Sequence, residues 1–309
     1  MSHRTSNTIM KVKKMKKIFK QLFSLSILTF MIGMFILYAQ KGPKIEETIT
    51  YFPIDPSITY ETANTTLTTN KKEDGEHYEV IWKTTSKIPT NAYLRQDISF
   101  LYVNGRLQEK MGRWEQNIKE LNQQKKIILE DSSRVNSISF HFSELHPSEN
   151  QYRSAQRISS DTMYIIHSNY EPFHSFKQAI SANEIQWKSS LDKVTMDTLT
   201  YSWEQGYKKF QIKPSHYDLY LLTDLQKYSD SSLKGFSKSK SDEVIGKLWE
   251  GLYKNYFLGI TKEDGSIIDP IDSTIPLVLI SKNKSHLLVL FETKEKELIL
   301  LRQQILSQN

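Results

Sequence analysis

The chain has 309 residues, a formal net charge of +6 and no cysteine. Its length allows one or two domains, and the missing cysteines exclude disulfides, thiolate metal sites and cysteine nucleophiles. Seven of the 41 basic residues and none of the 35 acidic residues lie within 1–21, which leaves residues 22–309 with 34 basic against 35 acidic side chains. Because the excess charge belongs to the tail, we expect no nucleic-acid partner for the rest of the chain.

Residues 22–39 form a run of 18 residues without a charge. As a helix this run would be about 27 Å long, close to the roughly 30 Å thickness of a bilayer core. The basic tail 1–21 predicts a cytoplasmic N-terminus, with the remainder outside the membrane. The residues expected to anchor the chain in the bilayer are Leu22, Phe23, Leu25, Ile27, Leu28, Phe30, Ile32, Phe35, Ile36 and Leu37.

A cleaved signal peptide is the alternative for this segment. Its cleavage site would follow Leu37-Tyr38-Ala39, although the bulky Leu37 stands where a small residue is favoured. Cleavage after Ala39 would make the protein secreted rather than a single-pass membrane protein. Lysine outnumbers arginine 33 to 8, a composition typical of low-GC Gram-positive bacteria.

The sequence of residues 40–309, the part expected outside the membrane, divides into three segments. Residues 40–58 contain three prolines and indicate an extended stalk. Residues 59–168 predict a β-rich subdomain and residues 169–309 an α+β subdomain that packs against it. The expected fold class is therefore α+β, with antiparallel hairpins first, a helical middle and a C-terminal β-meander.

Within the β-rich segment the clearest signal is the Asn104-Gly105 pair between two strand-like runs, which predicts a hairpin. Residues 131–133 indicate a further turn. Trp114, Ile118 and Leu121 are spaced by four and three residues, and this spacing predicts a short helix within 113–124.

In the second half the apolar spacing becomes helical. It predicts a short helix over 173–181, a longer one reaching Phe210, and the clearest helix from Ser239 or Ser241 to Gly259. The wide apolar stripe of that last helix indicates that it packs against a sheet. Three apolar runs over 276–304 then predict the closing meander.

The most informative polar cluster is the sequence SFHFSELHP, which contains His141, Glu144 and His146. Strand alternation sends His141 to one face and predicts that Glu144 and His146 share the other. Those two are weak candidates for catalysis. A metal site requires three or four converging ligands, so we expect neither a metal nor a cofactor here.

Asp269 and Asp272 are further weak catalytic candidates, because glycan cleavage uses paired carboxylates. Their Asp-Pro-Ile-Asp context is also ordinary turn chemistry. The sequence contains no nucleophile elbow and no Gly-rich phosphate loop. Its Ser-x-x-Lys matches occur about as often as chance predicts.

Two functions follow from these observations. The first is a non-catalytic binding, assembly or regulatory module anchored at the outer face of a bacterial cell membrane. Its partners would be the bilayer and an envelope protein or wall polymer. The alternative is a membrane-tethered hydrolase or transferase that acts on envelope glycan or peptide.

Overall fold

The computed structural model describes residues 50–73, 75–262 and 265–305. The predicted tail and anchor lie outside these residues. The described residues belong to one compact unit. Among the described residues, none of the helices combines the length and the hydrophobicity that a membrane crossing requires.

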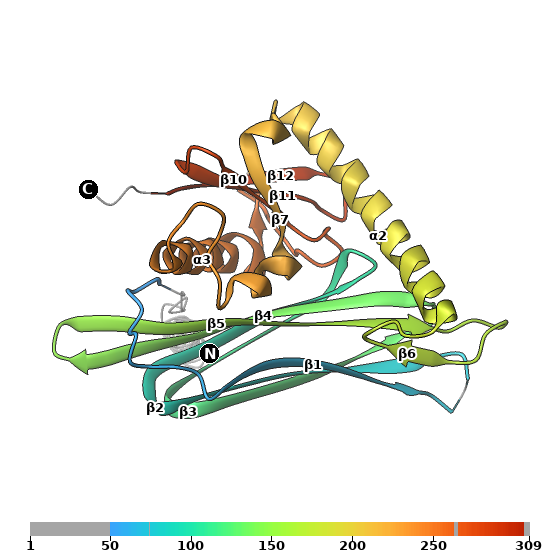
Figure 1. The fold of residues 1–309 in the computed structure, drawn as a ribbon, viewed down its shortest axis with the longest axis horizontal. Coiled ribbons are helices and arrows are strands. Elements are labelled where there is room, and N and C mark those ends of the chain that lie inside the picture. Colours follow the sequence, from blue (N-terminus) through green and yellow to red (C-terminus); the bar gives the residue numbers. More distant parts are fainter. Residues whose placement is uncertain (1–49, 74, 263–264, 306–309) are drawn as a thin grey trace, which may run out of the picture. The chain divides into compact units, whose positions relative to one another are not determined.

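Two antiparallel sheets and two long helices make up the unit (Figure 1). The first sheet has the order β1-β2-β4-β5-β6, with β3 also paired to β2. Its strands are β1 (Thr62–Lys71), β2 (Tyr78–Val103), β3 (Arg106–Leu129), β4 (Ser133–Ser148), β5 (Gln151–Ile166) and β6 (His174–Phe176). The second sheet, in the order β12-β11-β10-β7, consists of β7 (Tyr217–Leu221), β10 (Leu277–Ser281), β11 (His286–Glu292) and β12 (Leu298–Gln304). The remaining elements are α2 (Ala182–Lys209), α3 (Lys238–Leu252), the hairpin β8 (Ile260–Thr261) and β9 (Ile267–Ile268), 3-10 turns at Pro214–His216 and Leu222–Tyr228, and a π turn at Tyr253–Phe257.

The long strands β2 and β3 bend together and fold the first sheet over on itself. Their register jumps from Lys87 opposite Glu120 to Ala92 opposite Ile118, so β2 carries extra residues at this point. Pro89 falls within the extra residues, where its missing N–H removes no ladder hydrogen bond. The first half of β2 pairs with β1, and its second half pairs with β4.

We call the folded-over sheet the roll. Strand β1 lies against β5 inside it, where the Thr65 and Ser159 hydroxyl oxygens are 2.6 Å apart and the Leu67 amide donates to Asp161 at 2.7 Å. The interior has apolar residues at both ends and polar residues between them. One apolar end contains Leu67, Tyr78, Val80, Trp82, Leu101, Val103, Met111, Val135, Met163 and Ile165, and the other, at the bend, contains Ile88, Ala92, Leu145 and Ala155.

The other face of β2 packs against α3 and the second sheet. Alternation sends Ile98, Phe100 and Tyr102 to this face. Trp249 of α3 is fully buried and stacks on Phe140 at 5.1 Å between ring centroids. The same apolar cluster includes residues of β11, so α3 lies between the two sheets (Figure 1).

Several sequence predictions are confirmed. Asn104 and Gly105 connect β2 to β3 with φ angles of 49° and 85°, as a tight hairpin requires. The two longer helices form, although the N-cap of α3 is Ser237, two residues before Ser239 and four before Ser241. The antiparallel hairpins and the C-terminal β-meander are present as predicted.

Two predicted helices are wrong. Residues 113–124 belong to β3, because Trp114, Ile118 and Leu121 lie on a strand that bends at Asn117, whose φ angle is 54°. The bend interrupts the two-residue alternation and imitates a helical period. Residues 173–181 contain the short strand β6 followed by turns, since pairing with β5 satisfies their backbone groups.

Candidate functional site

Glu144 and His146 lie together at the end of β4, as strand parity predicts. The His146 Nε2 and Glu144 Oε1 atoms are 2.6 Å apart, and both side chains are partly exposed. His141 points the opposite way and is completely buried. Pro147 coincides with a register shift between β4 and β5, which ends regular pairing and leaves His146 at the surface.

Two tyrosine rings contact His146, and a phenylalanine ring packs against one of them. Tyr93 stacks on it at 3.9 Å with an interplanar angle of 13°, and Tyr152 meets it edge-on at 4.9 Å. Phe52 in turn stacks on Tyr152 at 5.4 Å. Tyr93 is 55% exposed and Tyr152 is 48% exposed. We call Phe52, Tyr93, His146 and Tyr152 the aromatic end; they come from three segments that are distant in sequence.

The chain reaches the aromatic end through residues 50–58, which are fastened to β5. The Ser154 hydroxyl donates to the Phe52 carbonyl at 2.6 Å, and the Ser154 amide donates to the Pro53 carbonyl at 2.9 Å. The Asp55 amide donates to the Ser154 carbonyl at 2.8 Å. Hydrogen bonds from Ser57 lower the pKa of Asp55. Residues 52–57 of the predicted stalk therefore contact the folded unit directly.

A polar cleft of about 640 Å³ lies between this segment and the start of α3. Both basic and acidic side chains line this cleft. Lys238 is hydrogen-bonded to Asp242, and Lys240 pairs with Glu243 at 2.9 Å. Burial raises the pKa of Asp242, and burial together with Glu243 and Asp242 raises the pKa of Tyr51 to about 12. The lining residues are Tyr51, Pro53, Ile54, Pro56, Arg153, Lys238, Ser239, Asp242 and Glu243.

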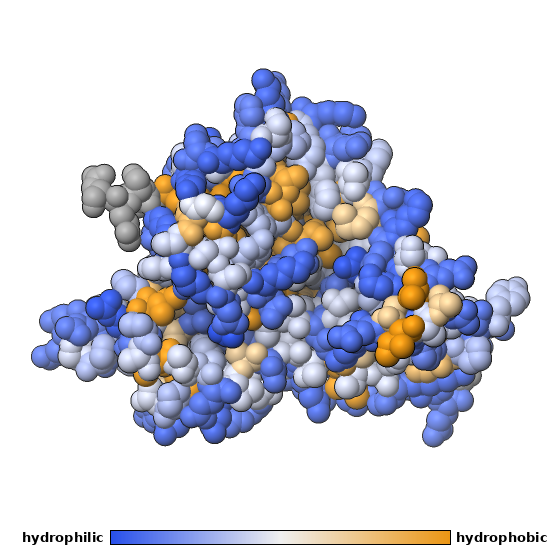
Figure 2. All heavy atoms as spheres, viewed as in Figure 1, coloured by the Kyte–Doolittle hydropathy of each residue, from blue (hydrophilic) through white to orange (hydrophobic). Residues whose placement is uncertain are grey.

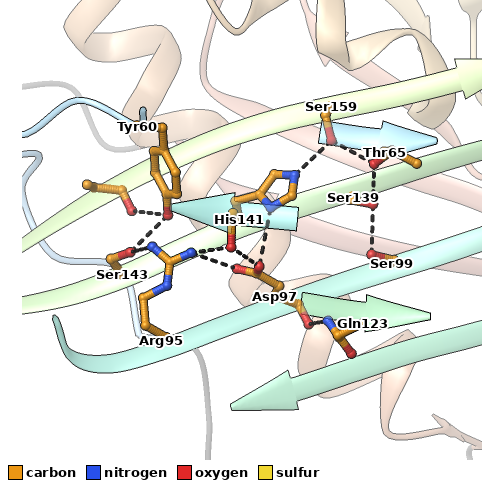
Figure 3. Close-up of polar contacts among 12 residues, drawn as sticks. Tyr60, Thr65, Arg95, Asp97, Ser99, Gln123, Ser139, His141, Ser143 and Ser159 are labelled. Atoms are coloured by element: carbon orange, nitrogen blue, oxygen red, sulfur yellow. Dashed lines mark hydrogen bonds and ion pairs between the residues drawn. The ribbon is translucent and has the colours of Figure 1, made fainter. Parts of the chain in front are cut away.

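A second polar constellation lies in the middle of the roll (Figure 3). His141 Nε2 is 2.7 Å from Ser159 Oγ, and His141 Nδ1 is 3.3 Å from Asp97 Oδ2. This order of groups is that of a Ser-His-Asp hydrolase. The three residues come from β5, β4 and β2.

The Arg95 guanidinium lies beside this chain of hydrogen bonds. Arg95 and Asp97 are both completely buried, with Arg95 Nη2 3.6 Å from Asp97 Oδ1. Arg95 donates to Ser143 at 2.6 Å and also to Ser86, and its charge lies 5.1 Å from the centre of the Tyr60 ring. We call the buried polar set the polar belt; it comprises Tyr60, Thr65, Ser86, Arg95, Asp97, Ser99, Ser139, His141, Ser143 and Ser159.

The polar belt is enclosed, which limits its chemistry. Ser159 is only 8% exposed, and its hydroxyl also contacts Thr65 at 2.6 Å. A serine nucleophile must reach a substrate carbonyl and needs donors beside the developing oxyanion. In the described fold Ser159 faces β1 rather than a substrate cleft, so the belt acts as the polar filling of the roll.

The other two candidate carboxylates lie elsewhere. Asp269 is exposed and 3.6 Å from Lys110, while Asp272 forms a turn with φ of 67° and its carbonyl accepts from Arg106. Lys110 is opposite residue 100 of β2, whereas Glu144 is opposite residue 94. Six residues of strand separate these points by about 20 Å, so the four candidates do not form one site. Within the described residues no group of three or more ligands is arranged for a metal ion.

The sequence did not reveal the rings around His146. Tyr152 follows the hairpin tip in an ordinary strand, and Phe52 and Tyr93 approach it only through the fold. On the face viewed in Figure 2, the apolar residues form several separate patches, and hydrophilic residues lie between them. The aromatic end combines two half-exposed tyrosine rings with the Glu144–His146 pair.

Comparison with known proteins adds no family name. No protein-family model, no curated protein and no solved structure matches this chain.

Proposed function

We propose that this chain is a membrane-anchored extracytoplasmic module that binds rather than cleaves, with an assembly or regulatory role at the outer face of a bacterial cell membrane. The observation that supports it is the aromatic end, where Tyr93 and Tyr152 are half exposed around His146. Tyrosine suits a binding surface because it offers a large rigid ring with a polar tip at a small cost in conformational entropy.

A tethered hydrolase is the second candidate, and one observation favours it. Ser159, His141 and Asp97 follow one another at hydrogen-bonding distances. Binding is preferred because Ser159 is enclosed, while the partly exposed Glu144 carboxylate is held by His146. Neither group is poised to attack or protonate a bound substrate.

Photo-crosslinking in the native membrane tests the proposal. A photoreactive phenylalanine analogue replaces Tyr93 in the full chain, and a matched variant carries it at Tyr201, an exposed tyrosine of α2. We expect one reproducible adduct with an envelope lipid, protein or wall polymer at position 93 that is absent at position 201. Equal labelling at both positions, or none, would contradict a binding role for the aromatic end.

A fluorophosphonate probe tests the hydrolase. We expect the folded wild-type protein to remain unlabelled, because the Ser159 hydroxyl is enclosed. Ser159→Ala is the control that identifies the labelled atom. Labelling that disappears in Ser159→Ala, together with turnover of an envelope ester or amide, would favour the hydrolase.

A further inference from the structure

The aromatic end combines features of a surface that meets a lipid headgroup layer. Its rings form a continuous row, with Phe52 on Tyr152 at 5.4 Å, Tyr152 on His146 at 4.9 Å and His146 on Tyr93 at 3.9 Å. Tyrosine is enriched at membrane interfaces because its ring is apolar and its hydroxyl remains hydrated. Tyr93 and Tyr152 have this mixed character, with about half of each side chain exposed.

The chain enters the folded unit at the same end. Phe52 belongs to the row and lies two residues after Thr50, the first described residue. Hydrogen bonds from Ser154 fix this segment to the start of β5. The eleven residues from Gln40 to Thr50 can span at most about 40 Å when fully extended. An anchor ending at Ala39 therefore keeps the aromatic end close to the bilayer.

The opposite end of the first sheet lies much farther from the tether. Strand β5 runs for 16 residues from the aromatic end to Ile166, which is about 50 Å at the ordinary rise of a strand. Tyr170, which is 96% exposed, follows that far end. The tether therefore favours contact by the aromatic end over contact by other exposed tyrosines.

The charged side chains near the aromatic end do not favour a ligand of either charge. Glu144 is paired with His146, and Arg153 lies near enough to Asp55 to lower its pKa slightly. Because both signs are present, attraction to anionic lipids is not the main contribution. The row of rings offers contact that does not depend on headgroup charge.

We propose that the aromatic end rests in the headgroup layer of the outer leaflet, so that the first sheet points away from the membrane along β5. This contact rests on the anchored location proposed above, and it makes a phospholipid surface the ligand of the aromatic end. The tether makes this contact intramolecular, so even a weak interaction is populated. The far end, with β6 and the start of α2, then faces the envelope.

Single cysteines provide the test, because the chain has none of its own. The full chain is placed in phosphatidylcholine nanodiscs with an environment-sensitive fluorophore at Glu149→Cys, in the turn beside Tyr152, or at Asn169→Cys, beyond the other end of β5. Headgroup-labelled quencher lipids report proximity. We expect strong quenching at position 149, little at position 169, and no loss of quenching at high salt.

A double variant separates ring contact from mere tethering. Tyr93→Ser with Tyr152→Ser keeps the anchor, so its quenching at position 149 should fall to the value at position 169. Tyr93→Phe with Tyr152→Phe should retain quenching, and Tyr201→Ser on α2 should leave it unchanged. Melting curves verify that each variant is folded.

Three results would overturn the membrane contact. They are equal quenching at both positions, quenching at position 149 that survives the serine double variant, and a crosslink from position 93 to a protein or glycan instead of lipid. The last result would leave the proposed binding function intact, whereas a lipid adduct at position 93 supports both proposals.

Discussion

Arg95 and Asp97 place two charged side chains in the interior of the roll, where apolar residues are usual. Both side chains are completely buried, and the Arg95 Nε and Asp97 Oδ1 atoms have no hydrogen-bond partner. Removing two charges from water costs more than their attraction usually returns. We infer that the pair serves specificity, because it joins the two halves of β2 through Ser86 and holds the bend in one register.

Loss of one member of this pair should therefore be costly. Arg95→Met leaves the Asp97 carboxylate buried without its cation, and we expect the free energy of unfolding to fall by about 3–5 kcal/mol. Arg95→Met combined with Asp97→Leu should be less destabilised than Arg95→Met alone. Urea unfolding measures both.

Arg113→Met is the matched control for that experiment. Arg113 forms an exposed pair with Glu115 at 2.8 Å, and such pairs contribute about 0–1 kcal/mol. If Arg95→Met and Arg113→Met lowered the free energy of unfolding equally, the buried pair would contribute no more to stability than an exposed one.

At the scale of elements, two helical glycines have opposite roles. A Cβ on Gly206 of α2 would lie 2.6 Å from Leu290 of β11, whereas a Cβ on Gly251 of α3 would meet only Gln303 at 3.6 Å. Alanine gains up to about 1 kcal/mol over glycine in a helix, while overfilling a core costs about 1–3 kcal/mol. We expect Gly206→Ala to lower the melting temperature and Gly251→Ala to raise it. A stabilising Gly206→Ala would mean that α2 can move away from β11.

The start of α2 should make stability depend on pH. Backbone hydrogen bonds from Ser181 and Ile180, together with His174, lower the pKa of Glu184 from 4.5 to about 2. A lowered pKa stabilises the fold above pH 4.5, and this contribution is lost as the pH falls from 4.5 towards 2. We expect Glu184→Gln to lose less stability than wild type between pH 7 and pH 3. Chemical unfolding at both pH values measures the difference, and the exposed Glu204→Gln of the same helix should behave like wild type.

The sequence predicted elements whose signals are local. The Asn104-Gly105 hairpin, α3 and the shared face of Glu144 and His146 follow from neighbouring residues alone. The roll was not predicted, because β3 lies at a sheet edge where charged side chains replace alternation. The hydrogen-bond partners of His141 could not be predicted either, because they come from strands that are distant in sequence.

For the whole molecule, the predicted location makes a separate prediction. If residues 22–39 remain as an anchor, the protein should resist extraction by alkaline carbonate, and its intact mass should include the basic tail. This expectation follows from the 18 uncharged residues beside seven basic ones. Mass spectrometry of the mature N-terminus provides the measurement, and a chain beginning at Gln40 would indicate secretion instead.

The closure of β1 over β5 cannot form until β5 has been synthesised. The Leu67 amide and the Asp161 carboxylate that it contacts are 94 residues apart in sequence. A ribosome adding about 5–20 residues per second needs roughly 5–20 s to supply that distance. During this interval Thr65 and Leu67 of β1 lack their Ser159 and Asp161 partners, although β2 and β4 already offer contacts to the same face. A nascent chain that stops before β5 therefore leaves the side of β1 that β5 covers open to chaperones and proteases.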